Sequence, residues 1–319
     1  MGKLKSIESR PEKEPALDLN IASLNLCETV DQMIERIESA RKESGVDVVV
    51  LGEYNFKVED VLNQLEKIKE AARGNRADIV MAPDNEFGRN LSWGELKSEL
   101  QANGIAVEES PVPDEYKPQS VGVFIDKAGA AYAFPKTWHL GNVRRPVHKI
   151  PGTSIGITIC GEIGEIQPQD LEGLTVLYNP SREGDDPYLK FRMLHRHGSG
   201  ELTREAVAAL LKNDTYYQSL LDDSQYNPDD PDYIPEYDSR NVREQKFNDA
   251  VDSHLEAAAN PENSMYVKKI EGALLERNIP VVRTDGAGTT GVLNKLPNAE
   301  IENLEYREGL TRYNLKIKV

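Results

Sequence analysis

The chain has 319 residues, 39% of them hydrophobic, and its formal net charge is −16 at neutral pH. This length is sufficient for one large α/β domain or two small ones with a substantial core. So negative a charge argues against nucleic acid and anionic membranes as partners. No apolar run approaches the roughly 20 residues that a membrane helix needs, so we expect no membrane partner either.

The first 18 residues predict a mobile tail ahead of a single domain at 19–319. This N-terminal segment is charged and lacks the apolar stretch of a signal peptide. Only two cysteines occur, Cys27 and Cys160, and they are far apart in the sequence. They form neither a zinc-binding spacing nor a disulfide framework, which favours a reducing, cytoplasmic location.

Residues 19–82 alternate between predicted strands and predicted amphipathic helices. Strands are expected at 19–26, 46–51 and 77–82, and helices at 30–44 and 58–68. Thr29 and Gln32 form a capping-box signature at the start of the first helix, and Gly45 ends it. The strand at 46–51 is apolar almost without interruption, which predicts burial on both faces. This β-α-β-α-β order is typical of an α/β domain.

The second half of the chain predicts a mixed sheet and a long helical insertion. A hairpin is expected at 120–134, and further strands at 152–160, 174–180, 279–285, 289–293 and 312–319. Residues 183–278 have a helical pattern, with segments near 201–212, 240–258 and 264–277. They are interrupted at 222–238, where seven acids and three prolines predict an exposed, mobile loop.

Three predicted strand ends carry side chains that suit acyl transfer. Glu53 ends one strand, Lys136 follows the hairpin, and Cys160 ends another strand. The carboxylate can take the thiol proton, the ammonium can stabilise an oxyanion, and the thiolate can attack a carbonyl carbon. The sequence therefore predicts a Glu-Lys-Cys site at one edge of a sheet.

The segments around these residues resemble a divergent member of the nitrilase or carbon–nitrogen hydrolase superfamily. The matching segments are VVVLGEYNF (48–56), IDKAGAAYAFPKTWHL (125–140), GITICGEI (156–163), VLYNPSR (176–182) and RTDGAGTTGVL (283–293). The resemblance implies an α-β-β-α sandwich, a homodimer or higher oligomer, and no metal or organic cofactor. It implies hydrolysis of a small amide, carbamoyl group or nitrile through a cysteine thioester. Glu53 would be the general base, Lys136 the oxyanion stabiliser and Cys160 the nucleophile.

The sequence departs from the family pattern at three places. Gly52 replaces the proline before the glutamate, Gly161 replaces the aromatic residue after the cysteine, and no acid occurs between Thr137 and Ile159. Many members carry a second glutamate in that interval. Either Glu162 or Glu165 supplies its role, or the second half-reaction is impaired. The alternative function is therefore a catalytically inactive binding or assembly protein that uses the helical insertion.

A cationic segment precedes Cys160. It contains Arg144, Arg145 and Lys149, and an arginine fork suits a carboxylate because it donates two parallel hydrogen bonds. We therefore expect Arg144 and Arg145, with Glu162, to bind a substrate, and that substrate to carry a carboxylate near the scissile bond. The other interpretation makes these cations the partners of the acidic 222–238 segment.

Three weaker motifs favour other functions. GTSIG at 152–156 matches a nucleophile elbow, but Ser154 is followed by a β-branched run, where the elbow needs a helix. The glycines of 286–291 match a phosphate-binding pattern but also lack a following helix. His195 and His197 are two residues apart in a predicted helix, so they point in different directions and make a poor pair of metal ligands.

Overall fold

The computed structural model describes the following residues of the chain: 16–24, 27, 29–138, 140–141, 145–182, 203–212, 221, 239–259, 279–285, 291–292, 299–307 and 310–318. His139, Arg144, His195 and His197 lie outside them, as do the 222–238 segment, the predicted helix at 264–277 and most of the 183–278 insertion. Within the described part of the chain, no helix is both long and apolar enough to cross a membrane.

The larger of two sheets has eight described strands in the order β12-β13-β1-β2-β3-β5-β6-β4. Their bounds are β1 Ala16–Leu24, β2 Val48–Lys57, β3 Asp78–Asp84, β4 Ala106–Val107, β5 Val121–Ile125, β6 Ala131–Pro135, β12 Ala299–Arg307 and β13 Leu310–Lys318. β1, β2 and β3 are parallel, whereas β5 and β6 form the predicted antiparallel hairpin. The sheet is therefore mixed.

The smaller sheet has five described strands in the order β11-β10-β9-β8-β7. Their bounds are β7 His148–Lys149, β8 Ile155–Ile157, β9 Val176–Ser181, β10 Val281–Asp285 and β11 Gly291–Val292. β8, β9 and β10 are parallel, and the short strands at the two edges pair antiparallel. Segments far apart in the sequence thus meet at the centre of the sheet.

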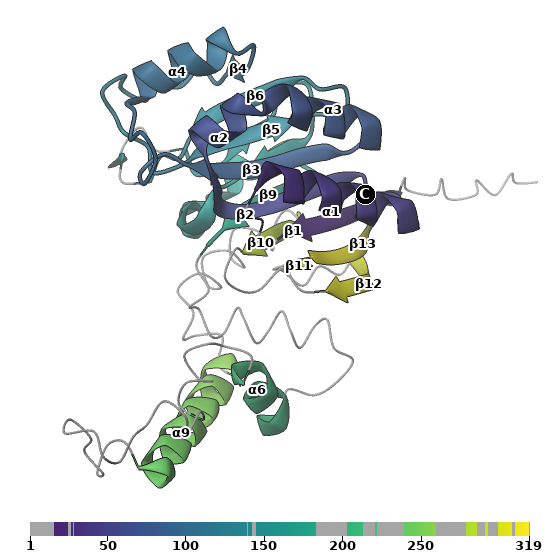
Figure 1. Ribbon diagram of the computed structural model, residues 1–319, viewed down its shortest axis with the longest axis vertical. Helices are drawn as coiled ribbons and strands as arrows, with labels where there is room; N and C mark the ends of the chain where they lie inside the picture. Colours follow the sequence, from purple (N-terminus) through teal and green to yellow (C-terminus); the bar gives the residue numbers. More distant parts are fainter. Residues whose placement is uncertain are drawn as a thin grey trace, which may run out of the picture.

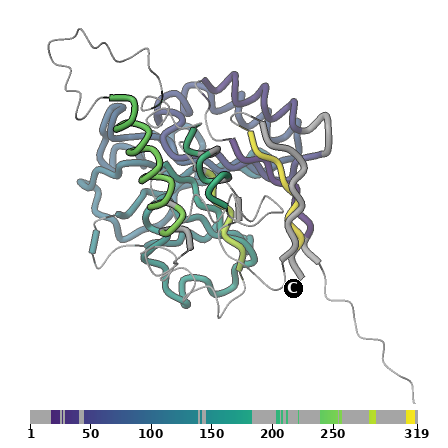
Figure 2. Tube along the Cα trace, turned by 90° about the horizontal axis from the view of Figure 1, so that it is seen from below, coloured from purple at the N-terminus to yellow at the C-terminus, as the bar shows by residue number. Residues whose placement is uncertain are grey.

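Helices cover the face of the large sheet that points away from the small one (Figure 1). Their bounds are α1 Val30–Ser44, α2 Val58–Asn63, α3 Leu65–Asn75 and α4 Trp93–Ala102. Two 3₁₀ helices follow β8, η2 at Cys160–Glu165 and η3 at Pro168–Leu171. Two helices of the insertion, α6 Arg204–Leu211 and α9 Arg240–Ala259, run side by side (Figure 2) and are joined by a small apolar cluster.

Strand β2 shows how one segment supports two hydrophobic layers. Val49 and Leu51 pack in the cluster under the helices, whereas Val48 and Val50 pack in the cluster between the sheets. Successive side chains of a strand point to opposite faces, so an uninterrupted apolar run is buried on both. The prediction of a strand covered on both faces is confirmed.

The small sheet is also covered on both faces. Tyr178 packs between the sheets, and its neighbour Leu177 is fully buried without belonging to that cluster. Val281 on β10 behaves in the same way. The predicted α/β class with two packed mixed sheets is confirmed. The outer face of the small sheet is buried, as the second helical layer of the expected α-β-β-α sandwich requires.

Several expected boundaries differ from the observed ones. β1 begins at Ala16 and pairs along its full length with β13, so ordered structure starts before the expected tail ends at residue 18. The helix expected at 58–68 is two helices, which meet at Gln64. Helix α4 and strand β12 were not predicted at all. The extra residues of β1 pair with β13, the strand expected at 312–319, which is remote from β1 in the sequence. β12 pairs with the same strand.

Candidate active site

Glu53 and Lys136 are in direct contact in the interior. The Lys136 Nζ atom lies 2.7 Å from the Glu53 Oε1 atom, and both side chains are almost completely buried. Cys160, which is 4% exposed, lies near enough for its charge to affect the pKa of Lys136. Three residues that are far apart in the sequence thus lie in one small region.

The Glu53 carboxylate is held by one of its two oxygens. Oε1 accepts hydrogen bonds from Lys136 Nζ and from Ser120 Oγ, each at 2.7 Å. Oε2 is buried and has no hydrogen-bond partner among the described residues. A buried carboxylate oxygen without a partner is costly, and such groups concentrate where a proton is to be accepted.

Glu53 does not end its strand, contrary to our expectation. β2 continues to Lys57, with shifts of register against β3 on either side of Glu53. The next residue, Tyr54, has a φ of 63°, in the left-handed region that is unfavourable for a non-glycine residue. The irregularity is a bulge, and bulges reorient side chains near functional sites.

Lys136 follows β6 directly, as predicted. Burial lowers the pKa of Lys136, but the Glu53 carboxylate, the nearby Cys160 and Tyr54 side chains and the hydrogen bond to Glu53 outweigh that effect and raise it. The ammonium group is therefore charged at neutral pH. Its Nζ atom also lies 5.7 Å from the centre of the Tyr54 ring, a cation–π contact.

Cys160 occupies a turn that begins η2, just after β8. Its φ is 48°, a second left-handed non-glycine residue at this site, and such strain is found where the surrounding structure over-determines a conformation. Asn179 Nδ2 donates to the Cys160 carbonyl oxygen at 3.2 Å, and Ser181 Oγ lies 3.5 Å from the Cys160 Sγ atom. Asn179 and Ser181 both belong to β9, so this strand holds the backbone and the sulfur atom of Cys160 in place.

Glu162 is fully buried and joins the segment after Lys136 to the segment before Cys160. Its Oε1 atom accepts from Thr137 N at 2.6 Å and from Thr137 Oγ1 at 2.9 Å, and its Oε2 atom accepts from Ile159 N at 3.2 Å. Burial raises the pKa of Glu162, although nearby His148 and the bonds from Thr137 oppose the rise. Both oxygens already have protein partners, so this geometry favours a positioning role over the substrate contact that we expected.

Gly161 accommodates an aromatic ring supplied from another segment. A Cβ atom at position 161 would lie 3.1 Å from Cη2 of Trp138, two residues after Lys136. Such a distance is tighter than ordinary van der Waals contact. Gly161 thus stands where the family pattern has an aromatic residue, and the ring of Trp138 packs against this glycine.

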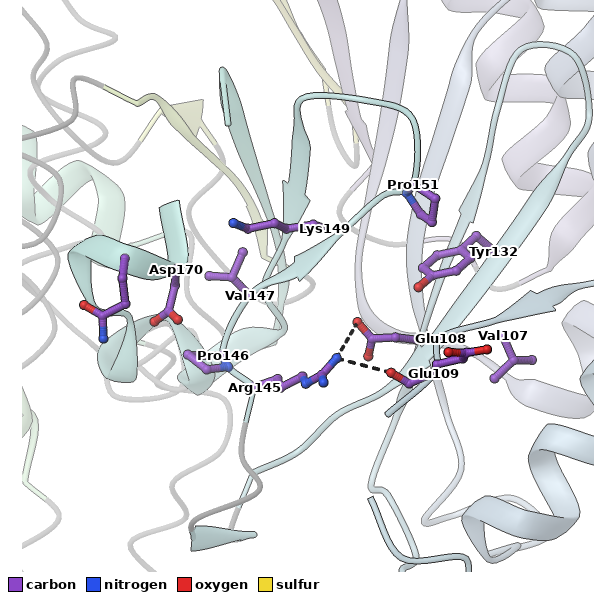
Figure 3. Close-up of a pocket in the computed structure, with 11 residues that line it drawn as sticks. Val107, Glu108, Glu109, Tyr132, Arg145, Pro146, Val147, Lys149, Pro151 and Asp170 are labelled. Carbon is purple, nitrogen blue, oxygen red and sulfur yellow. Dashed lines mark hydrogen bonds and ion pairs between the residues drawn. The ribbon is translucent and has the colours of Figure 1, made fainter. Parts of the chain in front are cut away.

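The predicted cationic residues Arg145 and Lys149 line a different hollow (Figure 3), a cavity of about 600 Å³ whose lining contains none of Glu53, Lys136 and Cys160. The Arg145 Nη1 atom lies 3.8 Å from Glu108 Oε1 and donates to the Glu109 carbonyl oxygen at 3.3 Å. Lys149 Nζ donates to the Glu172 carbonyl oxygen. Carboxylate binding by Arg145 stays a prediction, and Arg144 lies outside the described residues.

Sequence reasoning missed four residues of this site. Ser120 and Ser181 contact Glu53 and Cys160, and a single serine in a strand gives no signal of such a role. Tyr54 and Arg182 lie within the segments that carry the family resemblance, yet nothing in those segments indicates that they touch. The Arg182 Cζ atom lies 5.5 Å from the centre of the Tyr54 ring.

Among the described residues, no group of three or more His, Cys, Asp or Glu side chains is arranged to hold a metal ion.

Comparison with known proteins gives no match to a protein-family model and no match to a curated protein sequence. The fold is similar to a carbon-nitrogen hydrolase from Helicobacter pylori G27, at 12% identity over 87% of this chain and 80% of that one, with a TM-score of 0.38. It is similar to Saccharomyces cerevisiae Nit3, a member of branch 10 of the nitrilase superfamily, at 13% identity over 64% and 76% of the chains, with a TM-score of 0.35.

A third similar structure is an amidase from Nesterenkonia sp., at 13% identity and a TM-score of 0.33. The match covers 53% of this chain and 66% of that one, just under two thirds of the amidase.

Proposed function

We propose that this protein is a cofactor-independent hydrolase of a small, non-peptide carbon–nitrogen bond, acting through a thioester on Cys160. The observation that carries the proposal is the Glu53 carboxylate, buried beside Lys136 with Oε1 bonded and Oε2 without a partner. Charged groups are rarely buried unless paired, and a half-paired carboxylate next to a strained cysteine suits proton transfer from a thiol.

In the proposed first half-reaction, Glu53 takes the thiol proton of Cys160 through Oε2. The thiolate then forms a bond to the carbonyl or nitrile carbon. The Lys136 ammonium, which is charged at neutral pH, stabilises the negative charge that develops on the substrate oxygen or nitrogen. For an amide, Glu53 returns the proton to the leaving nitrogen as the carbon–nitrogen bond breaks, and the acyl group remains on sulfur. For a nitrile, the proton goes to the substrate nitrogen and gives a thioimidate. One water then adds to its carbon and ammonia leaves, which gives the same thioester.

In the proposed second half-reaction, Glu53 takes a proton from water while the water oxygen attacks the thioester carbon. The carbon–sulfur bond breaks, the acid leaves, and the proton returns to the thiolate. We assign to Glu162 the task of holding the Lys136 and Cys160 segments in register, because it bonds the residue after the first and the residue before the second.

Trapping the thioester by mass spectrometry tests the proposal. Incubation with small aliphatic amides, followed by rapid acid quenching, is expected to add an acyl mass to the peptide that contains Cys160. Cys27 provides the internal control, because burial raises the pKa of its thiol and protonated thiols are poor nucleophiles. Adduct on neither cysteine, with no turnover of amides or nitriles, would favour the alternative of an inactive binding or assembly protein.

A further inference from the structure

We propose that Arg182 binds a carboxylate of the substrate, which makes the preferred substrates short-chain amides that carry a carboxylate near the scissile bond. This inference rests on the proposed function and adds a substrate class to it. It transfers to Arg182 the role that the sequence suggested for Arg144 and Arg145.

The position of Arg182 follows from its neighbour. Ser181 ends β9, and its Oγ atom lies 3.5 Å from the Cys160 sulfur. Consecutive Cα atoms are about 3.8 Å apart, so the backbone of Arg182 lies one residue away from a contact with the nucleophile. Arg182 is exposed, whereas Ser181 is buried, so the chain passes from the reacting sulfur to solvent at this point.

Two cationic side chains, those of Lys136 and Arg182, lie over the Tyr54 ring. Lys136 Nζ lies 5.7 Å and Arg182 Cζ 5.5 Å from the centre of the same ring. The negative charges of Glu53 and Cys160 are near enough to raise the pKa of Tyr54 further, after burial has raised it. The ring therefore connects the buried ammonium to an exposed guanidinium.

The contact with Tyr54 leaves the donors of Arg182 available. A guanidinium that lies over an aromatic ring directs its N–H groups outward in its own plane, where they can bind a carboxylate through two parallel bonds. Within the described part of the chain, Arg182 contacts the Tyr54 ring and forms no ion pair. Arg145, in contrast, is already engaged by Glu108 and Glu109.

The charge of Arg182 affects the pKa of one described acid, Asp84. Burial raises the pKa of Asp84, while bonds from the Phe87 and Glu86 backbone and the charges of Arg182 and Lys57 oppose the rise. Asp84 Oδ1 accepts from Phe87 N at 3.2 Å. Asp84, the last residue of β3, is thus bonded to the segment that follows the strand and forms no ion pair with Arg182.

The test compares a carboxylate substrate with a neutral one. Values of kcat/KM are measured for the monoamides of succinic and glutaric acid and for neutral alkyl amides of equal length. In Arg182→Ala, we expect a loss of about tenfold or more on the acid monoamides, the effect of one lost charged hydrogen bond, and no change on the neutral amides. Arg182→Lys is expected to recover part of the loss, because it keeps the charge without the fork. Arg145→Ala is measured beside it, because the sequence suggested Arg145 for the same role. Arg89→Ala, which removes an exposed arginine paired with Glu99, is the matched control and should change neither.

A second measurement does not depend on turnover. The rates at which iodoacetate and iodoacetamide alkylate Cys160 are compared, with glutathione as the reference for their intrinsic reactivities. Arg182→Ala should lower the ratio of the anionic to the neutral reagent, and Arg145→Ala should not.

Four results overturn the inference. Equal losses on both substrate types, or an unchanged alkylation ratio, would remove the role of Arg182 and leave the proposed function standing. A selective loss in Arg145→Ala instead would return the role to that residue. A Cys160 that reacts with neither reagent, in a protein that hydrolyses no amide, would remove the proposed function and this inference together.

Discussion

Two ion pairs in this molecule combine the same kinds of charge in different surroundings. Lys136 and Glu53 are 2.7 Å apart, with side chains that are 6% and 0% exposed. Arg145 and Glu108 are 3.8 Å apart, with side chains that are 43% and 9% exposed, so water reaches this pair from the arginine side. Both basic residues belong to the segment that the sequence marks as functional, so charge and sequence position do not separate them.

Burial separates the two pairs. An exposed pair is screened by water and contributes between about 0 and 1 kcal/mol. A buried pair has lost its hydration, so removal of one partner leaves an uncompensated charge in the interior. The buried pair also leaves Glu53 Oε2 without a bond. The pair that the proposed mechanism uses is therefore the one whose arrangement is least favourable for stability.

The largest expected effect comes from removing the sulfur at the buried site. Cys160→Ala should reduce amide or nitrile hydrolysis to the background rate while the far-UV circular dichroism stays that of the wild type, because only the nucleophile is lost. Cys27→Ala is the matched control, since Cys27 is the other buried cysteine, and it should keep activity. Turnover by the Cys160 variant would refute the proposed mechanism.

Lys136→Met tests the buried pair directly. We expect kcat to fall by about 10²–10³, as for the loss of an oxyanion stabiliser. We also expect the free energy of unfolding to fall by about 3–5 kcal/mol, because Glu53 is left charged and buried. Steady-state kinetics and urea unfolding measure the two effects. A kcat equal to that of the wild type would reduce this lysine to a structural partner of Glu53.

Glu162→Gln tests the buried carboxylate that joins the segment after Lys136 to the segment before Cys160. Glutamine presents an amide NH₂ to a backbone donor, so we expect a loss of about 1–3 kcal/mol in unfolding free energy. Burial raises the pKa of Glu162 in the folded protein. The stability that this carboxyl contributes is therefore complete below the ordinary glutamate pKa of about 4.3 and falls as the pH rises through the folded value.

The difference in stability between wild type and Glu162→Gln should consequently narrow as the pH rises. Urea unfolding at a series of pH values, with Glu165→Gln from the same 3₁₀ helix as control, measures this trend. A difference in unfolding free energy between wild type and Glu162→Gln that stays constant or widens toward alkaline pH would contradict a raised pKa of Glu162.

The smallest expected effect is that of Arg145→Met. This pair is long and solvent-exposed on the arginine side, so the unfolding free energy should change by no more than about 1 kcal/mol. Added salt should reduce even that difference, because it screens exposed charges. A loss as large as that of Lys136→Met would show that burial is not what distinguishes the two pairs.

Local pattern in the sequence was sufficient for the elements that depend on near neighbours. The Thr29 side chain accepts from Gln32 N at 3.1 Å and Gly45 has a φ of 71°, as the predicted helix cap and stop require. The apolar run before Glu53 forms a strand buried on both faces because period-two geometry allows nothing else. Lys136 directly follows β6 and Cys160 comes just after β8, as the local pattern indicated, although both side chains are buried.

Other features were decided only by the tertiary structure. Ser120 Oγ bonds Glu53 across 67 positions of sequence, and Arg182 meets the Tyr54 ring through the packing of one sheet on another. The cationic segment that contains Arg145 suggested a substrate-binding role for this residue. The fold instead places Arg145 against Glu108 and Glu109. Such contacts depend on how the two sheets pack against each other. No local pattern in the sequence indicates which distant residues will meet.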